Sequence, residues 1–130
     1  MLTNIFIYNT GEAPIYEQIC TQIKDQILSG DLRAGEPLPS IRSLAKDLRI
    51  SVITTKRAYE DLEAQGFLTT VAGKGSFVAE GNQDALRQSR LEEVKDCLRQ
   101  AVNKAHTCNL EKQELLNLFE SLLEEDTNHE

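Results

Sequence analysis

The sequence has few cysteines, no long apolar run and an excess of acidic residues, and each of these limits what the protein can be. Its 130 residues include 3 cysteines, too few for a disulfide framework. A transmembrane helix is excluded because no stretch of about 18 apolar residues is present. The N-terminal residues lack the basic and apolar segments of a secretory signal, so we expect a cytoplasmic protein that does not associate with membranes.

Groups that carry catalysis or bind metals are also scarce. Cys20, Cys97 and Cys108 contain no Cys-x-x-Cys pair, and the sequence has 2 histidines. His106 and Cys108 could form a weak metal pair, but metal sites usually need three or four ligands. The favoured interpretation of the cysteines is therefore small, buried or half-buried side chains. No nucleophile is paired with a general base, so we expect no enzyme activity, no cofactor and no metal.

Charge is unevenly distributed along the chain. The formal net charge of -7 argues against a protein that binds nucleic acid over its whole surface. Residues 1–80 hold 8 Lys and Arg against 10 Asp and Glu, a net of -2, and residues 81–130 hold 6 against 11, a net of -5. Positions 40–59 carry 5 basic residues against 1 acidic residue, a net of +4. Positive charge is thus concentrated in one segment.

The first 80 residues have the periodicities of three helices followed by a β-hairpin. In residues 14–29 an isoleucine recurs at every fourth position. Ser40 and Ser51 each precede a further segment of helical period and are suited to cap it. Residues 67–71 and 76–79, joined by the turn "AGKG", have the composition of two short strands. This order is typical of a winged helix-turn-helix domain.

From residue 81 onward the sequence is acidic and helical. Two helices of about 40 residues in all cannot form a core of their own, so their apolar stripes must pack on the first domain or on a second copy. We therefore expect a mostly α protein, with a winged helix-turn-helix domain at 1–80 and a dimerisation and candidate effector region at 81–130. The residues expected at the dimer interface are Leu91, Val94, Leu98, Val102, Leu115, Phe119 and Leu122.

The helix that follows Ser51 has an inward and an outward face. Its inward positions, spaced i, i+3, i+4 and i+7, are Thr55, Ala58, Tyr59 and Leu62. Its outward or lateral positions are Val52, Ile53, Lys56 and Arg57. Outward residues in the first turn of the second helix of a helix-turn-helix contact base edges. An exposed Ile53 is expected to pack against a thymine methyl group.

Hydroxyl and basic groups complete the candidate DNA-binding site. Thr54 and Thr55 place hydroxyls at a helix N-terminus, where the helix dipole favours a phosphate. Arg42 projects from the first turn of the preceding helix, and Lys74 lies between two glycines at the hairpin tip. The predicted DNA-binding residues are Ser40, Arg42, Ser51, Val52, Ile53, Thr54, Thr55, Lys56, Arg57, Lys74 and Gly75.

Alternative interpretations exist for the same residues. Lys56 and Arg57 have acidic partners four positions later, a common arrangement on a solvated helix. The stretch "AGKGS" is not a phosphate-binding loop, because glycine follows Lys74 and the flanking residues have strand character. A winged-helix module that binds proteins and not DNA is the second interpretation of the chain, and it is supported by the net charge and by Val52.

Residues 32–78 resemble the DNA-binding domain of the GntR family of bacterial transcription regulators, through "LPSIRSLA", "TKRAYEDLEAQGFL" and "GKGSFV". The short helical tail is similar to that of the YtrA-like subfamily. The resemblance implies a DNA contact from the arginine of the second helix, contacts to phosphates or bases from the recognition helix, and a glycine in the wing tip. The matching residues are Arg42, Ser51, Thr54, Lys56 and Gly75. Val52 replaces an arginine of many members, so no guanine contact is expected there.

The resemblance also implies a homodimer that is formed through the C-terminal helices and binds a roughly palindromic DNA operator. It implies a regulator, most often a repressor, of transporter genes near its own. The apolar stripes of the tail agree with a dimer, since a two-fold protein contacts two half-sites. No residue constellation identifies an effector ligand.

Overall fold

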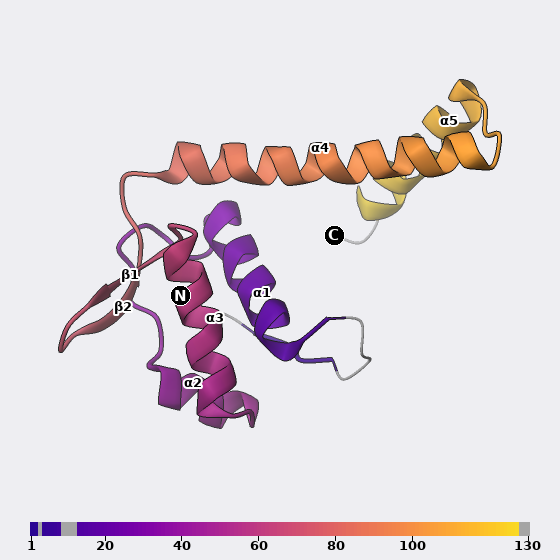
Figure 1. Cartoon of the computed structure of the whole chain (residues 1–130). Helices are drawn as coiled ribbons and strands as arrows, with labels where there is room; N and C mark the ends of the chain where they lie inside the picture. Colours follow the sequence, from indigo (N-terminus) through magenta and orange to yellow (C-terminus); the bar gives the residue numbers. More distant parts are fainter. Residues whose placement is uncertain (3, 9–12, 128–130) are drawn as a thin grey trace. The chain divides into compact units, whose positions relative to one another are not determined.

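The computed structural model describes residues 1–2, 4–8 and 13–127, and the chain divides into two compact units, Met1–Gln88 and Ser89–Glu130 (Figure 1). The elements are α1 (Ile15–Ser29), α2 (Ile41–Leu48), α3 (Val52–Ala64), β1 (Leu68–Val71), β2 (Gly75–Val78), α4 (Gln83–Thr107) and α5 (Lys112–Thr127). The predicted mostly α fold with a hairpin is confirmed. The first unit extends past the predicted boundary at residue 80, because Leu86 in the first turn of α4 belongs to its core.

The core of the first unit is formed by α1 and α3, which lie side by side (Figure 1). The predicted isoleucine stripe faces it: Ile19 and Ile23 are fully buried, and so are Ala58 and Leu62 on α3. Gly30 ends α1 with φ 91, the left-handed conformation that only glycine adopts without strain. Truncating a fully buried core residue such as Leu62 to alanine is expected to cost about 2–5 kcal/mol of folding free energy.

The hairpin is extended by a third segment that the sequence did not reveal. β1 and β2 pair antiparallel, and the loop before α2 runs along the other edge of β2. The N–H of Gly35 donates to the carbonyl of Val78 at 2.8 Å, and the N–H of Val78 donates to the carbonyl of Glu36 at 2.8 Å. The N–H of Leu38 donates to the carbonyl of Ser76 at 2.9 Å. The hairpin is therefore connected to the segment that leads into α2.

The segment before α1 is held by glutamine side chains. The side-chain amide of Gln22 accepts from the N–H of Phe6 at 2.9 Å and donates to its carbonyl at 2.7 Å. Gln18 does the same for Tyr8, at 2.7 and 2.8 Å. Each amide therefore pairs with the backbone as a neighbouring strand would, and Ile5 and Ile7, on either side of Phe6, pack on the core.

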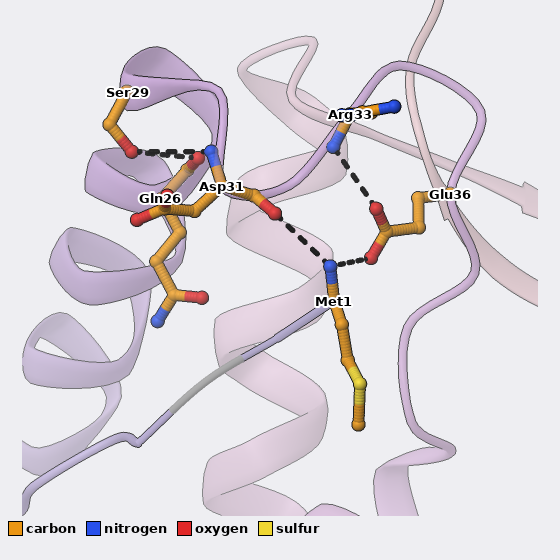
Figure 2. A network of polar contacts seen from close by, with 6 residues as sticks. All are labelled: Met1, Gln26, Ser29, Asp31, Arg33 and Glu36. Atoms are coloured by element: carbon orange, nitrogen blue, oxygen red, sulfur yellow. Dashed lines mark hydrogen bonds and ion pairs between the residues drawn. The ribbon is translucent and has the colours of Figure 1, made fainter.

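A polar network joins the first residue to the loop beside the hairpin (Figure 2). The α-amino group of Met1 donates to the carbonyl of Asp31 at 3.1 Å and forms an ion pair with Glu36. Glu36 also accepts the N–H of Arg33 at 3.3 Å. The Met1 amino group, and next the Arg33 N–H, lower the pKa of the Glu36 carboxyl. Because the carbonyl of Glu36 pairs with β2, these contacts tie the N-terminal segment to the hairpin edge.

Cys20 is expected to be chemically inert in the folded protein. Its Sγ donates to the carbonyl of Ala58 at 3.4 Å, and burial, followed by the nearby Asp61, raises its pKa to about 11. Only about one thiol in a thousand is then ionised at pH 8, and the thiolate is the reactive form. In a Cys97→Ser/Cys108→Ser variant, we expect Cys20 to react with a thiol reagent only as the protein unfolds in denaturant. Rapid labelling of the native variant would contradict this.

Candidate nucleic-acid interface

Two serines fix where α2 and α3 begin. Ser40 Oγ accepts the N–H of Ser43 at 3.0 Å, and Ser51 Oγ accepts the N–H of Thr54 at 3.0 Å. Both caps were predicted, and each is worth about 1 kcal/mol. Both serines are exposed, so the N-terminal ends of the two helices, with their positive dipole ends, are accessible to an anion such as a phosphate.

The turn between α2 and α3 is closed by a left-handed residue. Arg49 has φ 57, a conformation that costs roughly 1–2 kcal/mol for a residue with a Cβ, and its N–H donates to the carbonyl of Lys46 at 3.2 Å. The N–H of Ile50 then donates to the carbonyl of Ala45 at 3.0 Å. This tight turn places the exposed Arg49 two residues before the cap of α3. Sequence reasoning counted its charge but did not include it among the site residues.

The two threonines of α3 have different environments. Thr54 is partly exposed, and Ser51 Oγ donates to its Oγ1 at 2.7 Å, so the Thr54 hydroxyl keeps its own proton for a phosphate oxygen. Thr55 is fully buried, and its hydroxyl donates to the carbonyl of Ser51 at 3.1 Å. The prediction of Thr55 as a DNA contact is therefore wrong. Thr55 lies at an inward position of the helical period, so its side chain faces the core although it is close to the helix end.

Basic side chains of α3 and α2 occupy the surface around this helix end. Lys56 Nζ lies 3.8 Å from Glu60 Oε1, with both side chains 64% exposed, so the predicted pair is present but weak, about 0–1 kcal/mol. The guanidinium of Arg57 stacks on the ring of Tyr16, 3.7 Å from its centroid, and the in-plane N–H groups of a stacked guanidinium can still donate. Arg42 is exposed in the first turn of α2, which lies beside the N-terminal part of α3 (Figure 1).

The hairpin presents a lysine at an exposed tip. Gly73 has φ 77 and Gly75 has φ 107, and between them the N–H of Lys74 closes the turn on the carbonyl of Val71 at 2.9 Å. Both glycines therefore have conformations that strain other residues. Strand β1 is anchored to α3 near the turn of the hairpin, because the hydroxyl of Thr70 donates to the carboxylate of Glu63. This anchor links the hairpin to the C-terminal half of α3, and no local sequence signal predicted it.

Three helices, a tight turn between the last two, and a two-stranded wing define a winged helix-turn-helix protein. Residues 15–78 match the family described as bacterial regulatory proteins, gntR family. The HTH-type transcriptional repressor YtrA of Bacillus subtilis (strain 168) is 34% identical over 105 residues, which cover 81% of each chain. The protein therefore belongs to the GntR family of transcriptional regulators and is YtrA-like.

Two solved structures of other proteins are similar to the structure of this chain. A transcriptional antiterminator from Listeria monocytogenes EGD-e superposes with a TM-score of 0.74 at 30% identity, and the match covers 92% of this chain and 90% of that one. The DNA-binding domain of AraR, solved in complex with operator ORX1, superposes with a TM-score of 0.52 at 32% identity, and the match covers 57% of this chain and 92% of that one. The named relatives are regulators, and none indicates a catalytic function.

The second unit, Ser89–Glu130 (the helical unit), carries exposed apolar side chains on both α4 and α5. On α4 the predicted interface residues Leu91, Val94, Leu98 and Val102 are 41–46% exposed, and on α5 Phe119 is 45% and Leu122 61% exposed. Leu115 is partly buried. Three further exposed leucines on α5 were not among the predicted interface residues: Leu116, Leu118 and Leu123. This number of exposed apolar side chains on two helices is more than scattered surface leucines provide, and it indicates an interaction site.

The turn between α4 and α5 is well defined, whereas the cysteines near it differ from expectation. Asn109 has φ 60, and the N–H of Leu110 donates to the carbonyl of the buried Ala105 at 3.0 Å. Cys97 and Cys108 are exposed in the single chain, so the prediction of buried or half-buried cysteines is correct for Cys20 alone. Within residues 1–2, 4–8 and 13–127, no group of three metal-ligating side chains is present, and no helix is long and apolar enough to cross a bilayer.

Proposed function

We propose that this regulator is a homodimeric repressor that binds a two-fold symmetric operator, with the first turn of α3 in the major groove and the hairpin tip on the neighbouring backbone. The observation that carries the proposal is the concentration of exposed donors around one helix end. These donors are Arg42 on α2, Lys56 on α3 and the partly exposed Thr54 hydroxyl, and residues 40–59 have a net charge of +4 in a chain of net charge -7.

The dimer part of the proposal rests on the helical unit. About 25 cal/mol is gained for each square ångström of apolar surface removed from water, so an uncovered row of leucines on two helices favours association. A second copy supplies the same row, which makes a two-fold interface self-complementary. A two-fold protein then presents two copies of α3 to two half-sites, about 10 base pairs or a multiple of that apart.

The target genes are also proposed from the subfamily. The resemblance to YtrA-like regulators supports control of transporter genes near the regulator's own gene. We propose that the protein acts in the cytoplasm. Positions of the selected operator upstream of such genes would support this part of the proposal. Operators found only upstream of unrelated genes would contradict it and leave DNA binding intact.

A selection from random libraries tests DNA binding directly. The full chain is incubated with random duplex DNA and, in parallel, with random single-stranded RNA, because one similar structure is described as an antiterminator. We expect enrichment of duplexes with an inverted repeat. Enrichment of RNA alone, or recovery of a protein partner from a lysate with no enriched duplex, would contradict the proposal and favour the interaction-module alternative.

A further inference from the structure

We propose that Val52 and Ile53 recognise thymine methyl groups, so that each half-site carries thymine where it faces the first turn of α3. This inference rests on the proposed function and adds the operator chemistry. Ile53 is 82% exposed and Val52 is 46% exposed, although both are aliphatic and adjacent. They occupy the first two positions of α3, where side chains of a recognition helix reach base edges.

The surroundings of this aliphatic pair favour DNA over protein as its occupant. Three exposed basic residues lie in the same helix-turn-helix segment, Arg42 on α2, Arg49 in the turn and Lys56 on α3, and residues 40–59 have a net charge of +4. A second copy that met this surface with its own would bring like charges together. Two side chains also offer far less than the roughly 800 Å² per partner that a stable protein interface buries.

The chemistry of the pair selects one feature of the major groove. Each base pair presents hydrogen-bond donors and acceptors there, and only thymine adds an apolar group, its C5 methyl. Val52 and Ile53 have no side-chain donor or acceptor, so they cannot pair with guanine or adenine edges as arginine or asparagine does. Their β-branched side chains have one strongly preferred rotamer in a helix, which lowers the conformational entropy lost on contact.

Replacing thymine by deoxyuridine in the selected operator tests the inference, since it removes the methyl and keeps the hydrogen-bonding edge. We expect each deoxyuridine at a contacted position to weaken binding by about fourfold, the value of one buried methyl group. Deoxyuridine at a thymine outside the half-sites is the matched control. The Ile53→Ala and Val52→Ala variants change exposed positions that contribute little to folding, and both should bind the operator less tightly. Each variant should also become insensitive to removal of the methyl group that the replaced side chain contacts.

Three outcomes would overturn the inference. If an operator is enriched but deoxyuridine at every half-site thymine changes the affinity less than twofold, the methyl groups are not contacted. If the sensitivity persists unchanged in Ile53→Ala and Val52→Ala, other groups contact them. If no duplex is enriched at all, both the proposed function and this inference fail, so the two failures are distinguishable.

Discussion

Replacing Arg42 and Lys56 together by alanine is expected to weaken binding to the selected operator by about 100-fold or more. A hydrogen bond to a charged group contributes about 1.5–3 kcal/mol, and the variant loses one from each side chain. Folding should be unaffected, because both side chains are exposed and the Lys56–Glu60 pair is weak. The measurements are operator affinity by fluorescence anisotropy and the thermal unfolding midpoint by circular dichroism.

The matched control removes the same charge elsewhere. Arg99→Ala/Lys104→Ala also deletes two exposed basic side chains of α4, and neither lies on the helix face of Leu91, Leu98 and Val102. It should lower non-specific attraction equally and leave the operator affinity within a fewfold of the original. Equal losses in the two variants would show that overall charge, and not the surface around α3, controls binding.

Salt dependence separates phosphate contacts from other effects of the Arg42 and Lys56 changes. The slope of log affinity against log salt falls by about 0.9 for each phosphate of duplex DNA that the protein no longer neutralises. The Arg42→Ala/Lys56→Ala variant should therefore have a slope smaller by about 1.8, twice that value for two phosphates. An unchanged slope with reduced affinity would indicate that these side chains contact bases or position other groups.

Local signals in the sequence predicted most of the first unit. A helix cap depends on the serine and the few residues after it, which is why Ser40 and Ser51 could be assigned correctly. Gly66, with φ 87, follows the C-cap of α3, and a glycine just past a helix is likewise a local signal. The period of the isoleucines in α1 and of the inward face of α3 likewise depends only on spacing along the chain.

Several features that sequence reasoning missed depend on contacts between separate segments of the chain. The pairing of the loop before α2 with β2 and the Glu63–Thr70 anchor join segments that no local pattern connects. The stacking of Arg57 on Tyr16 joins α3 to α1, whereas the sequence suggested a partner on α3 itself. Thr55 was predicted both as an inward residue and as a DNA contact, because its spacing suits the core and its residue type suits a phosphate contact. It is buried, so the inward assignment is the correct one.

Charged substitutions on the apolar surface of the helical unit are expected to convert the protein into monomers. Leu98→Glu and Phe119→Glu each place a carboxylate in the proposed interface, where an unpaired charge costs several kcal/mol if it is buried. Both positions are more than 40% exposed in the single chain, so the monomer has no reason to unfold. Sedimentation equilibrium or light scattering across a range of concentrations would measure the change.

Loss of the dimer should also reduce operator binding by about 100-fold or more. In the dimer, binding of the first half-site makes binding of the second an intramolecular event with a high effective concentration, and a monomer lacks this gain. Gln100→Glu is the matched control, because it adds the same charge at an exposed polar position of α4. Gln100 is two residues from Leu98 and therefore lies on a different face of the helix. This variant should stay dimeric. The proposed dimer would be contradicted if the wild type is monomeric. It would also be contradicted if the Leu98→Glu and Phe119→Glu variants dimerise and bind the operator as the wild type does. An unchanged half-site affinity in the monomeric variants would show that the surface around α3 binds DNA independently of the interface.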